Sequence, residues 1–163
     1  MTRVLVRRRL LLAAGGLVLA APAWAQKAPC ARPRVLFVCP AGTVKSAIAR
    51  ETLKRRAADR GVAVSVASRG LHPEDHVSPA LASRLKADGI DPGAEPVRAL
   101  APADLAVPDI LVAFDEAAQA PGLEHARVWD IPSWNSDYDH ARSALAVQVE
   151  TLLDELNKRP CGA

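Results

Sequence analysis

Apolar residues occur along the chain in short continuous runs, separated by segments that have helical spacing. The runs at residues 35–39 (VLFVC) and 110–114 (ILVAF) are uninterrupted, which is typical of central parallel strands covered on both faces. Residues 62–68 (VAVSVAS) alternate and are rich in valine, a pattern that favours another strand. A fourth and weaker strand is predicted at residues 127–129.

Two helices are predicted between these strands. Residues 46–60 have the spacing of an amphipathic helix, and Gly61 suits the left-handed conformation that follows a helix. A second helix begins after Ser78 as N-cap, with Pro79 at its first position, and stops at Gly89. The outer face of the first helix is predicted to be exposed and basic, with Arg50, Lys54, Arg55 and Arg56.

The last helix is predicted to follow Asp139, which can cap it, and to end before Pro160. A short helical turn is expected at residues 102–105. The inward positions of the last helix are Leu145, Val149, Leu152, Leu153 and Leu156. Because strands alternate with helices, the sequence predicts right-handed βαβ units and an α/β fold with a parallel sheet.

The first 25 residues have the pattern of an export signal. Four arginines precede an apolar run at residues 10–21, and residues 23–25 (AWA) fit a small-residue cleavage site. We interpret residues 1–25 as a signal peptide and expect a periplasmic or secreted protein. The run is shorter than the roughly 20 residues that span a bilayer, which argues against a membrane anchor. The arginines also fit a twin-arginine signal, so the export route stays open.

Removing this leader changes the charge balance. The 163 residues include 21 Lys and Arg against 18 Asp and Glu. Four of the 21 and none of the 18 lie in residues 1–25, so 17 basic residues face 18 acidic ones in the rest. This balance does not indicate a nucleic-acid partner. We expect one α/β domain at residues 34–158, between a linker at 26–33 and a tail at 159–163.

The chain has three cysteines. An exported protein meets an oxidising compartment, so a disulfide is predicted between Cys30, just before the first strand, and Cys161, just after the last helix. Cys39 would then be the free thiol. Sequence spacing does not fix the connectivity, and three free cysteines are the alternative.

Cys39 ends the first predicted strand, and five residues separate it from Lys45 before a helix begins. A loop that leads from a strand to a helix N-terminus directs backbone N–H groups at a ligand and binds oxyanions. The same positive field stabilises a thiolate. The residues predicted to bind phosphate are Ala41, Gly42, Thr43, Val44, Lys45 and Ser46.

This segment resembles the low molecular weight protein tyrosine phosphatases and the related thioredoxin-coupled arsenate reductases. Their signature is a strand followed by C-x5-R-S, and this chain has C-x5-K-S. Residues 68–70 (SRG), 89–91 (GID) and 109–112 (DILV) match further family segments in order. The resemblance implies a four-stranded parallel sheet flanked by helices. It also implies that Cys39 forms a phosphocysteine, that the loop and its cation hold the phosphoryl oxygens, and that an aspartate protonates the leaving group.

Three loop positions depart from the family pattern. Lys45 keeps the charge of the family arginine but lacks its planar fork. Pro40 has no N–H to contribute to the cradle. Gly42 replaces the asparagine that braces the loop in the family, which predicts a less preorganised loop.

The general acid is a fourth departure. The family has an Asp-Pro pair here, and the best local match puts Ser133 and Trp134 in its place. Asp130 is the predicted acid and Asp137 the alternative, although either could instead be a solvated loop residue or a helix cap. The resemblance implies that Trp134 and Tyr138 wall the active-site cleft, with core packing as the alternative.

Two other kinds of site are excluded by the spacing. A nucleotide-binding P-loop would need glycines at positions 39 and 44, where the chain has Cys39 and Val44. The four histidines have no ligand-like spacing, so neither a metal nor a cofactor is expected.

The leading hypothesis is an exported enzyme, a tyrosine phosphatase-like hydrolase of low activity that cleaves phosphate monoesters through Cys39. The alternative is a phosphate- or oxyanion-binding protein of the same fold without turnover. An arsenate reductase is less favoured, because residues 114–121 contain no resolving cysteine and only Cys30 or Cys161 could serve. The expected partner is a phosphorylated small molecule, a phosphoprotein or an inorganic oxyanion, without nucleic acid and without stable membrane insertion after signal cleavage.

Overall fold

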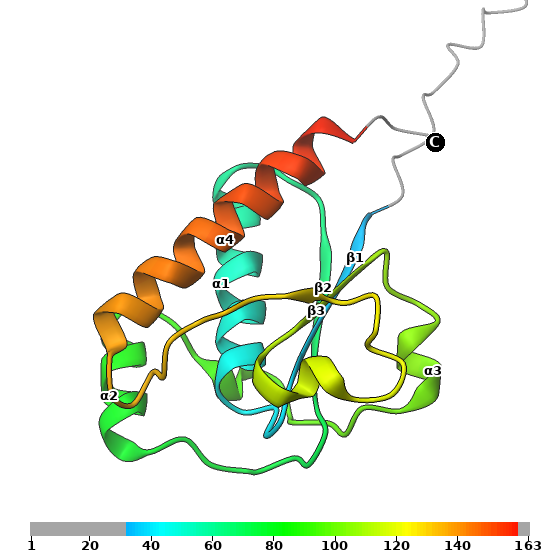
Figure 1. The fold of residues 1–163 in the computed structure, drawn as a ribbon. Helices are drawn as coiled ribbons and strands as arrows, with labels where there is room; N and C mark the ends of the chain where they lie inside the picture. The colour runs from blue at the N-terminus through cyan, green and yellow to red at the C-terminus, as the bar shows by residue number, and fades with distance from the viewer. Residues whose placement is uncertain (1–31, 160–163) are drawn as a thin grey trace, which may run out of the picture.

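A four-stranded parallel sheet forms the centre of the computed structural model, which describes residues 32–159 (Figure 1). The strands are β1 (Arg34–Cys39), β2 (Ser65–Gly70), β3 (Ile110–Ala113) and β4 (Arg127–Val128), in the order β2-β1-β3-β4. All neighbouring pairs are parallel. The predicted α/β fold with a parallel sheet flanked by helices is therefore confirmed.

Helices cover both faces of the sheet. Val35 and Phe37 of β1 pack in one cluster with α1 (Lys45–Asp59), α2 (Pro79–Ala87) and α4 (Tyr138–Lys158). Leu36 and Val38 point to the other face, where a second cluster includes residues of α3 (Pro102–Leu105) and of the 3-10 helix η2 (Asp115–Gln119). A further 3-10 turn, η1 (Pro92–Ala94), lies between α2 and α3. Both faces of β1 are thus buried, as its uninterrupted apolar run predicts.

Several predicted helix boundaries are confirmed. The Ser78 side chain accepts a hydrogen bond from the N–H of Leu81 at 3.4 Å, and Pro79 is the first residue of α2. Gly61 and Gly89 follow α1 and α2 with φ of 65° and 69°. The turn at residues 102–105 is α3.

The second strand begins three residues later than predicted, at Ser65. The reason is the end of α1, where the N–H of Gly61 donates to the carbonyl of Ala58 and the N–H of Val62 donates to that of Ala57. This pair of bonds is a Schellman motif, and it holds residue 62 on the helix end rather than in the sheet.

The prediction that Asp139 caps the last helix was wrong. The Asp137 side chain accepts a hydrogen bond from the N–H of His140 at 3.3 Å, and α4 begins at Tyr138. Asp139 instead pairs with Arg84 across the surface at 3.1 Å.

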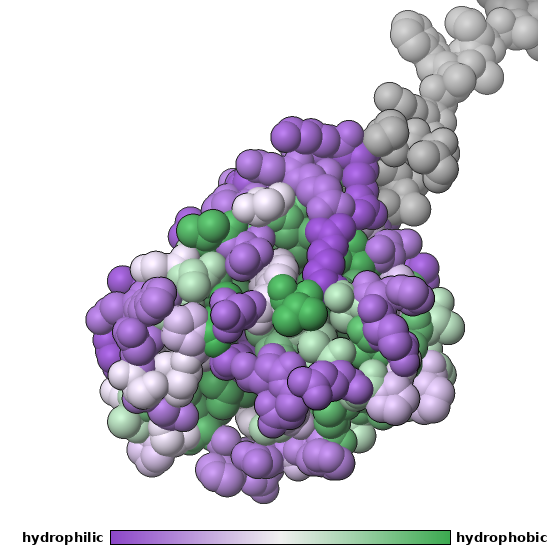
Figure 2. Space-filling model, in the orientation of Figure 1, coloured by the Kyte–Doolittle hydropathy of each residue, from purple (hydrophilic) through white to green (hydrophobic). Residues whose placement is uncertain are grey.

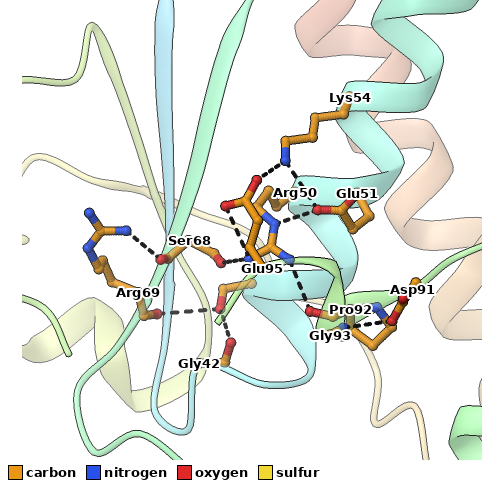
Figure 3. Close-up of polar contacts among 11 residues, drawn as sticks. Gly42, Arg50, Glu51, Lys54, Ser68, Arg69, Asp91, Pro92, Gly93 and Glu95 are labelled. Carbon is orange, nitrogen blue, oxygen red and sulfur yellow. Dashed lines mark hydrogen bonds and ion pairs between the residues drawn. The ribbon is translucent and has the colours of Figure 1, made fainter. Parts of the chain in front are cut away.

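The predicted exposure of Arg50 on the outer face of α1 was also wrong, because only 2% of this residue is exposed. One guanidinium nitrogen donates to the Ser68 hydroxyl at 2.7 Å and another to the carbonyl of Pro92 at 2.9 Å (Figure 3). The third nitrogen pairs with Glu51 at 2.6 Å. Arg50 therefore joins α1 to β2 and to η1, with every nitrogen hydrogen-bonded as a buried charge requires.

Figure 1 shows that β1 begins and α4 ends at the upper end of the molecule, while the loop after Cys39 lies at the lower end. Hydrophilic residues cover most of the face in Figure 2 and divide its apolar surface into separate patches. No helix within residues 32–159 is both long and apolar enough to cross a membrane.

We predict that Arg50→Met lowers the free energy of unfolding by about 3 kcal/mol, because it leaves a hydroxyl, a carbonyl and a carboxylate without their buried partner. Urea denaturation followed by circular dichroism measures this change. The matched control is Arg56→Met on the same helix, whose side chain is 46% exposed and has one ion pair at 3.7 Å. The control should cost less than about 0.5 kcal/mol. Equal losses in the two variants would contradict the anchoring role of Arg50.

Candidate active site

The loop between β1 and α1 lies directly against the end of β2. Gly42 has φ of +75°, and a Cβ atom built on it would lie 2.9 Å from the backbone of Gly70. A Cβ on Gly70 would lie 2.9 Å from the backbone of Ala41. Two glycines are therefore needed where the two backbones meet. The loop is braced here by this backbone contact, at the position where the family has a bracing asparagine side chain.

The carbonyl groups of this loop are turned toward the segment after β2. The carbonyls of Cys39 and Pro40 accept hydrogen bonds from the N–H groups of Leu71 and His72, at 3.2 and 2.9 Å. The carbonyl of Ala41 likewise accepts from a later amide of that segment, at 3.0 Å. The loop is thereby fixed through its carbonyls, so its N–H groups are not needed to hold it in place.

Several N–H groups of the loop have no acceptor. Within residues 32–159, no hydrogen bond involves the N–H of Ala41, Thr43 or Val44, and the buried hydroxyl of Thr43 is also unpaired. Backbone donors in folded proteins are rarely left in this state. Next to the N-terminus of α1, which carries partial positive charge, such donors suit an oxyanion. The loop thus has N–H donors suited to an oxyanion, and phosphate binding by residues 41–46 stays a prediction.

The sulfur of Cys39 has two close polar neighbours. Cys39 is 3% exposed. Its Sγ lies 3.1 Å from the Ser46 hydroxyl and accepts a hydrogen bond from the N–H of Gly42, also at 3.1 Å. The same hydroxyl is 3.4 Å from the carbonyl of Arg69. When Cys39 is a thiolate, both the hydroxyl and the amide can donate to it, and this is the contact set that stabilises a nucleophilic sulfur.

The ammonium group of Lys45 is held by two acceptors outside the loop. Its Nζ donates to Oδ1 of Asp115 at 2.5 Å and to the carbonyl of Ile131 at 2.6 Å. Asp115 begins η2, two residues after the end of β3, and Ile131 lies in the segment between β4 and α4. Lys45 therefore connects three segments at the C-terminal edge of the sheet.

The two carboxylates considered as general acid have different surroundings. The Asp137 carboxylate caps the N-terminus of α4 and also lies 3.4 Å from the His140 ring. Asp130 is exposed and forms no hydrogen bond or ion pair with any residue between 32 and 159. Only Asp130 is thus free to donate a proton to a leaving group, and it stays the predicted acid.

Sequence reasoning missed Asp115. It is the first polar residue after the buried strand β3, two positions beyond Ala113, and polar residues at that edge of a parallel sheet face the ligand site. Its φ of 55° makes it the only non-glycine residue with positive φ in the described part of the chain. The strand-end position was the signal that could have identified it.

Trp134 and Tyr138 belong to the main core. Their rings meet edge to face with centroids 5.3 Å apart, and the Tyr138 hydroxyl donates to Asp88 at 2.7 Å. Burial, together with this hydrogen bond, raises the pKa of Tyr138 to about 12. The packing alternative therefore accounts for both aromatic side chains.

No three His, Cys, Asp or Glu side chains within residues 32–159 gather in a way that could hold a metal ion. The predicted signal peptide at residues 1–25 and the predicted pair Cys30 and Cys161 lie outside the described residues, so both stay predictions. Cys39 is a free and buried cysteine in the described region.

Comparison with solved structures gives the same fold. YfkJ from Bacillus subtilis is 19% identical with a TM-score of 0.68, over 80% of this chain and 98% of that chain. The low molecular weight protein tyrosine phosphatase SP-PTP from Streptococcus pyogenes is 17% identical with a TM-score of 0.61, over 76% and 93% of the two chains. A thioredoxin-dependent arsenate reductase from Corynebacterium glutamicum is 21% identical with a TM-score of 0.60, over 77% of this chain and 62% of that chain.

No curated protein sequence matches this chain. The sequence model described as low molecular weight phosphotyrosine protein phosphatase matches residues 34–158, which include the strand, the loop and the helix that carry Cys39, Lys45 and Ser46. The resemblance seen in the sequence is therefore confirmed, and the chain belongs to the low molecular weight phosphotyrosine protein phosphatase family.

Proposed function

We propose that this protein is an exported phosphatase of low activity that hydrolyses phosphate monoesters through a phosphocysteine on Cys39. The observation that supports this proposal most directly is the placement of the Cys39 sulfur. It lies at the end of the central strand, 3.1 Å from both the Ser46 hydroxyl and the Gly42 amide. Phosphotyrosine is one candidate substrate, as for other members of the family.

In the first step the Cys39 thiolate attacks phosphorus, and the bond between phosphorus and the leaving oxygen breaks. The N–H groups of Ala41, Thr43 and Val44 hold the phosphoryl oxygens, and Asp130 gives its proton to the leaving oxygen. In the second step water attacks the phosphocysteine and gives a proton back to Asp130, the bond between phosphorus and sulfur breaks, and phosphate leaves with the thiolate restored. Supporting this scheme, a cysteine-to-serine mutant of the YwlE arginine phosphatase carries a phosphorylated active site serine.

Three features support low activity. The ammonium group of Lys45 donates hydrogen bonds to Asp115 and to the carbonyl of Ile131, so its charge is only partly available to a phosphoryl group. Pro40 contributes no N–H to the cradle. Asp130 is exposed, and no residue between 32 and 159 bonds to its carboxyl group and orients it.

The same features favour a second candidate, an oxyanion-binding protein without turnover. An arsenate reductase in the phosphate binding state, 18% identical and with a TM-score of 0.62, illustrates how this fold holds an oxyanion. The two candidates differ in one measurement. A phosphatase releases product from an aryl phosphate, whereas a binding protein is only stabilised against heat by phosphate. Turnover of arsenate that depends on reductant would instead identify a reductase.

Export of the protein, after removal of residues 1–25, is also part of this proposal. The start of β1 and the end of α4 lie at the same end of the molecule (Figure 1). This arrangement suits a disulfide between Cys30, four residues before β1, and Cys161, three residues after α4. Consistent with this proximity, the pKa of Asp109 is lowered mainly by the hydrogen bond from the backbone N–H of Arg34 at the start of β1, and to a smaller extent by the charge of Arg159 after α4.

We predict that periplasmic material contains a peptide pair joined by Cys30 and Cys161, and a Cys39 that can be alkylated after unfolding. Non-reducing proteolysis and mass spectrometry measure both. A disulfide that includes Cys39 would contradict the proposed pairing and favour redox chemistry.

We predict that the wild-type protein hydrolyses an aryl phosphate and that Cys39→Ser lowers the rate by about a thousandfold or more, because a hydroxyl is a far weaker nucleophile than a thiolate. Ser46→Ala should lower the rate about tenfold through loss of one donor to the thiolate. Ser143→Ala, on the exposed side of α4, is the matched control and should leave the rate unchanged. If Cys39→Ser retains the wild-type rate, the phosphocysteine mechanism is wrong.

Lys45→Arg should raise the aryl phosphatase rate about tenfold or more, equivalent to ~1.4 kcal/mol in barrier, because the guanidinium offers a planar fork to two phosphoryl oxygens. Steady-state kinetics with a chromogenic aryl phosphate measure the gain. Lys54→Arg on the outer side of α1 controls for the general effect of the exchange. A neutral Lys45→Arg would show that Pro40 or the acid limits the rate instead.

A further inference from the structure

Lys45 is the only charged side chain of the loop that could neutralise a bound oxyanion, and it is already paired. We propose that Asp115 competes with the oxyanion for Lys45 and thereby sets the affinity of the loop for phosphoryl groups. This inference rests on the proposed function, since it assumes that the loop after Cys39 binds an oxyanion.

The geometry of the ammonium group allows this competition. A lysine ammonium has three donors, and two of them are directed to Asp115 and to the carbonyl of Ile131. The Lys45 side chain is 16% exposed, so the pair is partly shielded from water and is stronger than a pair at the surface. An anion in the loop can accept a hydrogen bond from the third donor without any change in the other two. It feels the full positive charge of Lys45 only if the bond between Lys45 and Asp115 lengthens. The flexible stem of lysine permits such a movement.

Asp115 is held in place by its neighbours in the chain. The N–H of Phe114 donates to the carbonyl of Val38 at 2.9 Å, and Phe114 and Ala117 are fully buried. Between these two fixed points Asp115 adopts the left-handed conformation, with φ of 55°. Non-glycine residues in this conformation concentrate at functional sites, and aspartate is one of those that tolerate it. The carboxylate is therefore fixed beside Lys45 by a rigid strand end.

The charge balance of the site follows from this placement. With the Lys45–Asp115 pair intact, the cation of the loop is largely neutralised and the anion depends mainly on backbone N–H donors. Without the carboxylate, the positive charge of Lys45 would no longer be neutralised by a neighbour and would attract the anion fully. Asp115 is thus a residue that tunes affinity through Lys45, and it needs no direct contact with the substrate.

The test is the Kd for inorganic phosphate, measured by calorimetric titration at fixed ionic strength on the wild-type protein and on Asp115→Asn. Asparagine keeps the shape of the side chain and tolerates positive φ, so the backbone of η2 should be retained. Asp115→Asn should bind phosphate about tenfold more tightly. The control Glu116→Gln removes the same charge from the next residue, which is exposed, and should change Kd less than twofold. An unchanged or weaker affinity of Asp115→Asn would overturn the proposal.

A double-mutant cycle separates competition for Lys45 from simple repulsion between Asp115 and the anion. In a Lys45→Met background, Asp115→Asn should improve Kd clearly less than it does with lysine present. An equal gain in both backgrounds would also overturn the proposal. Aryl phosphate hydrolysis by the wild-type protein is measured alongside. If hydrolysis occurs but Asp115→Asn binds no more tightly, only the competition is wrong. If no variant binds phosphate and the wild type is inactive, the proposed function fails and the competition with it.

Discussion

The arrangement of the site depends on the close contact between two backbones, at Gly42 and Gly70. A Cβ atom on either glycine would collide with the other backbone at 2.9 Å. This contact brings the loop carbonyls within reach of the amides that follow β2, so the loop is held from outside. The N–H groups of Ala41, Thr43 and Val44 have no acceptor in the described part of the chain, and the amide of Gly42 donates to the sulfur of Cys39. The contact thus orients the donors of the loop around the thiol, which β1 places beside the N-terminus of α1.

Anion capture and catalysis place different demands on this site. Capture needs converging donors, and these are N–H groups of the loop backbone. Turnover also needs a cation that stabilises the negative charge of the transferring phosphoryl group, and an acid aligned with the leaving oxygen. In this chain the first requirement is built into the backbone, whereas the second depends on Lys45 and Asp130. Lys45 is paired with Asp115, and Asp130 is exposed and has no partner among the residues that the structure describes.

Much of the fold could be predicted because it depends on local rules. The central strand was clear from its continuous apolar run, and Gly61 and Gly89 marked helix ends through their need for positive φ. The depth of a side chain is a different matter. Arg50 lies three and seven residues before Leu53 and Ala57 and so shares the buried phase of α1, but its charge argued for an exposed position. Its hydrogen bonds to Ser68 and Pro92, 18 and 42 residues away, are what allow the charge to be buried.

The candidate site was predictable to a similar extent. Cys39, the loop and Ser46 follow from the order of strand, cysteine and helix, since chain connectivity alone brings them together. The partner of Lys45 does not follow, because Asp115 is 70 residues away and reaches the loop only through the pairing of β1 with β3. The start of β2 was misplaced for the opposite reason, since local bonds at the end of α1 outweighed the strand pattern of residue 62.

The burial of β1 has a consequence for how the molecule opens. Phe37 and Val38 are fully buried, and β1 is paired with a strand on each side. Central strands of this kind exchange their amide hydrogens last, because they are exposed only when the whole domain unfolds, whereas edges and termini open by themselves. Cys39 ends this strand. Local fluctuations at β4 or at the ends of α4 therefore leave in place the strand that carries the sulfur, so the nucleophile keeps its position while the periphery of the domain opens and closes.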